Sequence, residues 1–171
     1  MIDIKNIFPE CDADTLLVRL ITQRGNANHC KGISKVVNEL ECRKNQNSYL
    51  IGIVDSDKFK RKNDLKYLKF FSENIYNLIN NDEGIIIDKI PDKEHYIIYI
   101  HTEFEVWAWK QALLAGLNTN EFGFSDINEF YKESKHFRTN ESAKFKRFVN
   151  AIVIANPPGV KLLKEWLIVE N

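Results

Sequence analysis

The hydrophobic residues of this chain recur with two different periods, which predicts an α/β fold. Short apolar stretches rich in β-branched and aromatic residues predict strands, whereas apolar residues three and four apart predict helices. The predicted strands lie at 4–8, 50–57, 84–90 and 96–101, with a very short one near 29–30. The predicted helices lie at about 12–24, 34–43, 65–78 and 102–115, followed by one centred on 145–152 and one that starts at 157–158. This alternation favours a three-layer α/β domain with a mainly parallel central sheet and a C-terminal helical extension packed on it.

Polar residues before two of these helices predict how the helices begin. Asp12 or Asp14 can cap the first helix, because a carboxylate accepts hydrogen bonds from the backbone N–H groups of a first turn. Thr102 and Glu105 have the spacing of a capping box before the helix that follows the last strand. The apolar face of that helix is expected to consist of Phe104, Trp107, Ala108 and Leu114. We expect the three tryptophans in the core: Trp107, Trp109 and Trp166.

The stretch 50–57 carries the clearest chemical signal. Five apolar or glycine residues run without interruption and are followed by Asp55, Ser56 and Asp57. Such a run is typical of a strand that is covered on both faces of a parallel sheet, and ligands bind at the carboxyl ends of such strands. Because side chains two residues apart on a strand point the same way, both aspartates can face one cation such as Mg²⁺. The alternative is that they only cap the next helix and begin a turn.

Composition limits the class of protein. The 171 residues suit one domain, and the formal net charge of zero leaves nucleic-acid binding to a local basic patch. The three scattered cysteines favour reduced thiols in a cytoplasmic protein over a disulfide framework. The sequence predicts no signal peptide, no membrane-spanning segment, no Walker A loop and no zinc site with the usual ligand spacing.

Two motifs resemble those of Toprim domains, which occur in topoisomerases, bacterial primases and OLD-family nucleases. Glu10, with Asp14 four residues later, resembles the Glu-Gly-x-x-Asp motif at the start of these domains. Asp55 with Asp57 resembles their Asp-x-Asp motif. The resemblance implies that Glu10, Asp55 and Asp57 are catalytic and hold Mg²⁺ or Mn²⁺, with Asp14 as a direct ligand or behind the ligands. It also implies one Toprim-like domain over the whole chain, with the α/β core at 1–101 and the helical extension at 102–171.

Other residues extend or weaken the resemblance. Glu105, followed by Val106 and Trp107, is similar to a Glu-x-Trp segment of small stand-alone Toprim-like proteins, which implies that Glu105 is a further acidic residue near the metal. Cys11 stands where the family has glycine, either as a packed side chain or as a thiol ligand. The ATPase domain of OLD proteins, the zinc module of primases and the catalytic tyrosine region of topoisomerases are not encoded.

The resemblance implies metal-dependent phosphodiester hydrolysis, and a nuclease part of a defence system is one form of that expectation. A basic run follows the acidic pair and is expected to bind the phosphates of DNA or RNA: Lys58, Lys60, Arg61 and Lys62. The alternative for the basic run is a solvated loop. The alternative for the whole chain is a non-catalytic Toprim-like module that binds nucleic acid, a nucleotide or a protein partner such as an ATPase, away from any membrane.

Overall fold

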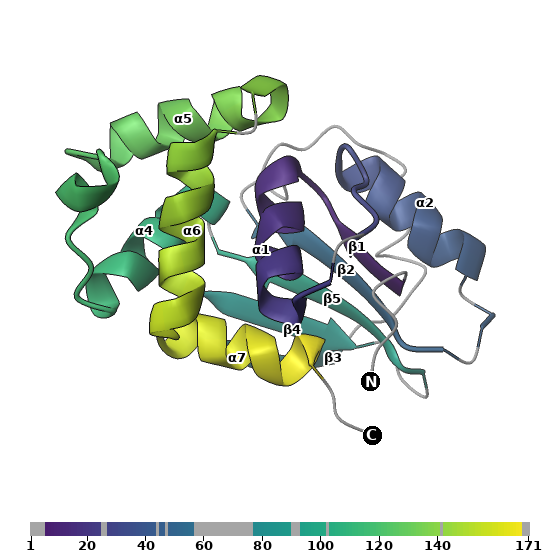
Figure 1. Cartoon of the computed structure of the whole chain (residues 1–171). Coiled ribbons are helices and arrows are strands. Elements are labelled where there is room, and N and C mark those ends of the chain that lie inside the picture. The colour runs from purple at the N-terminus through teal and green to yellow at the C-terminus, as the bar shows by residue number, and fades with distance from the viewer. Residues whose placement is uncertain are drawn as a thin grey trace.

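The chain folds into an α/β structure, as the sequence predicts. The computed structural model describes residues 6–24, 27–43, 45–46, 48–56, 77–89, 93–101, 103–140 and 142–168. The described strands are β1 (Ile7–Pro9), β2 (Leu50–Asp55), β3 (Asn77–Asp82), β4 (Ile85–Lys89) and β5 (His95–Ile100). The described helices are α1 (Asp12–Thr22), α2 (Ile33–Arg43), α4 (Phe104–Leu114), the short 3-10 helix η3 (Thr119–Phe122), α5 (Ile127–Asn140), α6 (Ala143–Ala155) and α7 (Pro158–Leu167). Figure 1 shows α1 across one face of the sheet, α6 beside α1, and α7 below them.

The described strands form one sheet in the order β1-β2-β5-β4-β3. β1, β2 and β5 are parallel neighbours, β4 runs antiparallel to β5, and β3 runs antiparallel to β4. The strands predicted at 84–90 and 96–101 are therefore neighbours in the sheet. Because β1, β2 and β5 point the same way, the residues that follow these strands gather at one edge of the sheet.

Alternating side chains of the sheet enter two cores on opposite faces. Ile51 and Ile53 of β2 belong to the core that includes residues of α1, α4, α6 and α7, whereas Leu50 and Val54 pack with α2. All six residues of β2 are buried, as its uninterrupted apolar run predicts. Gly52 lies under α2, where an added Cβ would be 2.9 Å from Cγ1 of Val36, so the missing side chain lets the helix approach the strand.

One strand prediction and part of one helix prediction are wrong. Residues 29–30 form no strand, although the N–H of Cys30 donates to the carbonyl of Pro9 at 2.9 Å. The helix predicted over 65–78 does not include Leu78, which lies in β3; its part before residue 77 falls outside the described residues. β3 and β4 form a hairpin whose two turn residues, Glu83 and Gly84, both have positive φ (50° and 73°). Such a two-residue loop fixes antiparallel pairing, and this pairing overrides the helical spacing of the apolar residues before it.

The start of α1 also differs from the prediction. Neither Asp12 nor Asp14 is the cap, because Cys11 occupies that position. Its Sγ accepts from the N–H of Asp14 at 3.4 Å, and the carboxylate of Asp14 accepts from the N–H of Cys11 at 3.3 Å. The two residues form a capping box in which a thiol replaces the usual serine or threonine hydroxyl.

The helices after β5 are predicted in part. α6 and α7 are confirmed, α7 begins at Pro158 as expected, and the tryptophans belong to the core, with Trp109 and Trp166 partly buried. The prediction that Leu114 belongs to the buried face of this helix is wrong, because Leu114 is 54% exposed. The buried face of α4 continues instead through Gln111, whose side chain accepts from the N–H of Gly159 at 2.9 Å and so satisfies a polar group inside the core.

Among the described helices, η3 and α5 are absent from the sequence prediction. α5 has few apolar residues, and its low mean hydropathy hides the helical spacing of Ile127, Phe130 and Tyr131. The sequence signal that could have located the start of α5 is Asp126. Its Oδ1 accepts from the N–H groups of Asn128 and Glu129 at 2.8 and 3.0 Å and so caps the helix. The core behind these elements is aromatic; Phe130, for example, stacks on Phe145 with ring centroids 5.2 Å apart.

Candidate acidic site at the carboxyl edge of the sheet

Glu10 and Asp55 are brought together, although they are 45 residues apart in the sequence. Glu10 directly follows β1, and its N–H donates to the carbonyl of Ile53 at 3.0 Å, which extends the β1–β2 pairing by one residue. Oε2 of Glu10 then accepts from the N–H of Asp55 at 3.3 Å. Both side chains are almost fully buried, with 3% and 6% exposed. The parallel pairing of β1 with β2 therefore places the carboxylate of Glu10 against the backbone of Asp55.

Asp55 also connects the sheet to α4. Its Oδ1 accepts from the N–H of Phe104, the first residue of α4, at 3.0 Å. A carboxylate at this place satisfies one of the unpaired N–H groups of a helix and interacts favourably with the helix dipole. Part of the role of Asp55 is thus structural, but the helix that it contacts is α4, and not the next helix along the chain that the capping alternative named.

Cys11 lies among these acidic side chains. Asp14, which is fully buried, bonds to Cys11 through the capping box, and its Oδ2 lies 3.0 Å from Sγ. Burial raises the pKa of the Cys11 thiol well above its usual value, and the negative charges of Asp14 and Asp55 raise it further. The thiol is therefore protonated at neutral pH, and its hydrogen bonds with Asp14 give it a structural role at the start of α1.

Ser56 and His101 are two polar residues of this edge that the sequence did not single out as a pair. Ser56 follows β2, and His101 follows the neighbouring strand β5. Oγ of Ser56 and Nδ1 of His101 form a hydrogen bond of 2.9 Å. Only the parallel pairing of β2 with β5 could have revealed this contact, because nothing in the spacing of the two residues indicates it.

Of the other predicted site residues, Glu105 contacts another helix and the rest lie outside the described residues. Oε1 of Glu105 accepts from the hydroxyl of Ser134 at 2.5 Å, which ties α4 to α5. α4 starts after Glu103, without a side-chain cap from that residue. Asp57 and the basic run lie outside the described residues: Lys58, Lys60, Arg61 and Lys62.

The carboxylates of Glu10 and Asp55 are candidate ligands for a divalent cation. Among the residues that the structure describes, no group of three histidine, cysteine or acidic side chains is arranged to hold a metal ion. Mg²⁺, however, keeps several waters and is often held by one or two carboxylates. Glu10 and Asp55 supply two carboxylates of the hard oxygen type that Mg²⁺ and Mn²⁺ prefer, so the donor set fits.

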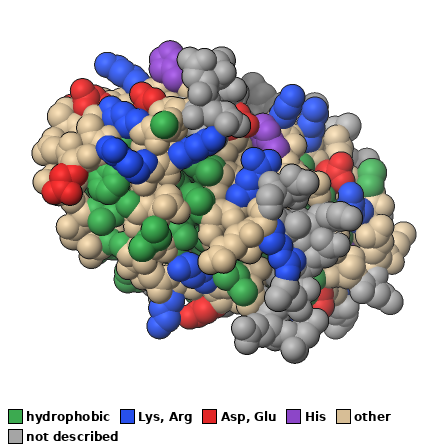
Figure 2. Space-filling view, viewed as in Figure 1, with side chains coloured by type: hydrophobic (Ala, Val, Ile, Leu, Met, Phe, Trp, Pro, Cys, Tyr) green, Lys and Arg blue, Asp and Glu red, His purple; other side chains and the backbone are tan. Residues whose placement is uncertain are grey.

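The surface adds little that would specify a ligand. Figure 2 shows hydrophobic side chains on the face formed by the helical extension, with lysines and arginines scattered among them. None of the helices in the described ranges is both long and apolar enough to span a membrane.

Fold and site together define the class of this protein. It is an α/β protein with two buried carboxylates at the carboxyl edge of its parallel strands. No protein-family model, no curated protein and no solved structure matches this chain. The inference of function therefore depends on the residues themselves.

Proposed function

We propose that the chain is a Toprim-like, three-layer domain that hydrolyses phosphodiester bonds with the help of Mg²⁺ or Mn²⁺. The observation that supports this most directly is the hydrogen bond of 3.3 Å between Glu10 and the N–H of Asp55. Two motifs that resemble the Toprim motifs are far apart in the sequence, and their first acidic residues meet at the edge of the sheet where ligands bind in α/β folds.

The residues have distinct roles in this proposal. Glu10, Asp55 and Asp57 hold the cation, with Asp14 behind them and Glu105 as a further acidic residue. When bound, the cation activates a water and stabilises the leaving oxygen of the phosphodiester. Glu10 alternatively accepts a proton from the attacking water as a general base. The phosphates on either side of the scissile bond bind to the basic run after Asp57: Lys58, Lys60, Arg61 and Lys62.

The test is a titration of Mg²⁺ and Mn²⁺ against the wild type and the variants Glu10→Gln and Asp55→Asn. Each amide keeps a carbonyl oxygen that can accept the backbone hydrogen bond at 3.3 or 3.0 Å, so the fold is retained while the charge is lost. We expect the wild type to nick plasmid DNA or cleave single-stranded RNA and each variant to lose at least about a hundredfold in rate, as expected for loss of a metal ligand.

Asp88→Asn is the matched control, because it removes a half-buried carboxylate from β4, away from the acidic pair. It should leave cleavage unchanged. If the wild type cleaves neither DNA nor RNA with either ion, the chain is not a nuclease on its own. It then either needs a partner such as an ATPase for activity or has no nuclease activity.

A second function is favoured by a specific observation. Oε2 of Glu10 and Oδ1 of Asp55 already accept backbone hydrogen bonds, which is what purely structural carboxylates do. A non-catalytic module that binds nucleic acid, a nucleotide or a protein partner would keep these bonds and bind no Mn²⁺. Calorimetric titration with Mn²⁺ in the absence of substrate separates the two functions.

A further inference from the structure

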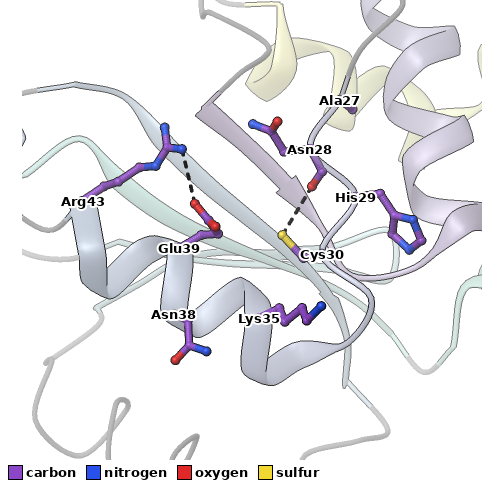
Figure 3. Close-up of a pocket in the computed structure, with 8 residues that line it drawn as sticks. All are labelled: Ala27, Asn28, His29, Cys30, Lys35, Asn38, Glu39 and Arg43. Carbon is purple, nitrogen blue, oxygen red and sulfur yellow. Dashed lines mark hydrogen bonds and ion pairs between the residues drawn. The ribbon is translucent and has the colours of Figure 1, made fainter.

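A pocket of about 650 Å³ opens beside α2, on the face of the sheet opposite α1 (Figure 3). One wall is the loop 27–30, and the other is the side of α2 that carries Lys35, Asn38 and Arg43. Its volume lies within the range of small-molecule sites and exceeds what one phosphate ion needs. The pocket is separate from the carboxylate side chains described above.

Arg43 and His29 of this pocket are held in place by neighbouring side chains. The guanidinium of Arg43 lies 5.0 Å from the ring centroid of Phe8 and 3.3 Å from Oε2 of Glu39. His29 at the opposite wall pairs with Asp12 at 3.2 Å. An arginine fixed by stacking and by an ion pair is preorganised, so a ligand that contacts it loses little side-chain entropy on binding.

The charge of the lining favours an anion. Glu39 offsets Arg43, whereas Lys35 is exposed and adds a second positive charge from the same helix. The Cys30 thiol contributes no negative charge, because burial raises its pKa to about 11, and its S–H donates to the carbonyl of Asn28 at 3.3 Å. The lining therefore carries an excess of positive charge at Lys35, which is where an anionic group of a ligand would bind.

The guanidinium of Arg43 favours a ligand with a planar group, because a guanidinium plane can stack on a base. The amides of Asn28 and Asn38 also line the pocket, but Figure 3 shows them pointing to different sides. A nucleotide combines a planar base with a phosphate and matches this set, whereas inorganic phosphate would use only the cations.

The pocket also adjoins the acidic site. Its loop is attached to the carboxyl end of β1, because the N–H of Cys30 donates to the carbonyl of Pro9 and the N–H of Gly32 to the carbonyl of Glu10, both at 2.9 Å. A strand that crossed the acidic edge would have a neighbouring nucleotide close to this loop.

We propose that this pocket binds a nucleoside monophosphate unit, with the phosphate on Lys35 and the base stacked on Arg43. The unit is either a free nucleotide or one residue of a single strand. This inference goes beyond the proposed function, because binding here requires neither a metal ion nor cleavage.

The test measures binding in EDTA, with fluorescein-labelled pentadeoxyadenylate followed by anisotropy, and with AMP and inorganic phosphate as competitors. We expect Lys35→Ala to weaken binding of the strand and of AMP by roughly tenfold, as the loss of one charged hydrogen bond implies. Arg43→Lys should keep the charge and lose the preference for AMP over phosphate. Lys161→Ala, an exposed lysine on α7, is the control and should bind as the wild type does.

Each result decides the matter. Binding that is weakened in Lys35→Ala and that prefers AMP to phosphate supports the site. If the strand binds more tightly than AMP, the ligand is nucleic acid; if the two bind equally, the ligand is a free nucleotide. Absent binding, or binding that is the same in Lys35→Ala, overturns the inference. If the wild type binds the nucleotide in this way but cleaves no nucleic acid, the pocket proposal stands and the nuclease proposal fails. If the wild type cleaves nucleic acid but Lys35→Ala binds as the wild type does, the nuclease proposal stands and the pocket proposal fails.

Discussion

At the residue scale, Cys11 shows how one side chain serves local structure and the site at once. Its thiol caps α1, and the same thiol lies close enough to Asp14 and Asp55 for their charges to raise its pKa. A protonated thiol between carboxylates adds no further negative charge to an already acidic region. We therefore assign Cys11 to positioning α1, and through α1 to positioning Asp14.

This assignment predicts the stability of two variants. Cys11→Ala removes the acceptor for the N–H of Asp14 and should lower the free energy of unfolding by about 1 kcal/mol, the usual cost of losing an N-cap. Cys11→Ser keeps an acceptor and should lose little or nothing. Urea denaturation measures both, with Cys42→Ala, at an exposed cysteine, as the control. Equal losses in the alanine and serine variants would show that packing of the sulfur, and not capping, matters.

At the scale of elements, the contact between β2 and α2 joins the two sites. β2 ends at Asp55, and α2 forms one wall of the pocket. The two elements touch at Gly52, where an added Cβ would lie 2.9 Å from Val36 and 3.0 Å from Leu40. The distance between β2 and α2 is therefore set by a residue without a side chain.

Gly52→Ala tests this contact. The added methyl group should push α2 outward and lower the free energy of unfolding by about 1–3 kcal/mol, the usual cost of overpacking a core. The double variant Gly52→Ala, Val36→Ala removes the closer of the two contacts, so its loss should be smaller than the sum of the two single losses. Additive losses in this double-mutant cycle would indicate that the strand and the helix adjust independently.

At the scale of the whole molecule, the sequence predicts the strands and helices that follow from local periodicity. It does not predict the contacts that follow from the pairing of strands. The uninterrupted apolar run of β2 and the spacing of α2 were sufficient, because burial on one or both faces determines such patterns. The contact between Ser56 and His101 was not predictable, since it arises from the parallel register of β2 and β5. The meeting of Glu10 with Asp55 was predictable only after β1 and β2 were assumed to be neighbours.

His95 links the stability of the whole fold to pH. It begins β5, is 2% exposed, and its Nε2 lies 3.1 Å from the carbonyl of Gln46. Burial lowers the pKa of His95 below its usual value of 6.5, because the charged imidazolium loses hydration there. The unfolded chain therefore takes up this proton at a higher pH than the folded chain. The contribution of His95 is present above pH 6.5 and is lost as the pH falls through the folded pKa.

We therefore expect the free energy of unfolding to decrease as the pH is lowered from about 7.5 to about 5, with a slope of at most about 1.4 kcal/mol per pH unit from this single proton. His95→Gln keeps a donor for the carbonyl of Gln46 and should flatten the slope, whereas His136→Gln, at an exposed residue of α5, should not. The range stays above the usual pKa of Glu94, 4.5, which Tyr96 and Lys89 lower further by hydrogen bonding, so this carboxylate does not contribute to the slope. Urea denaturation at each pH gives the measurement, and an unchanged slope in His95→Gln would place the titrating group elsewhere.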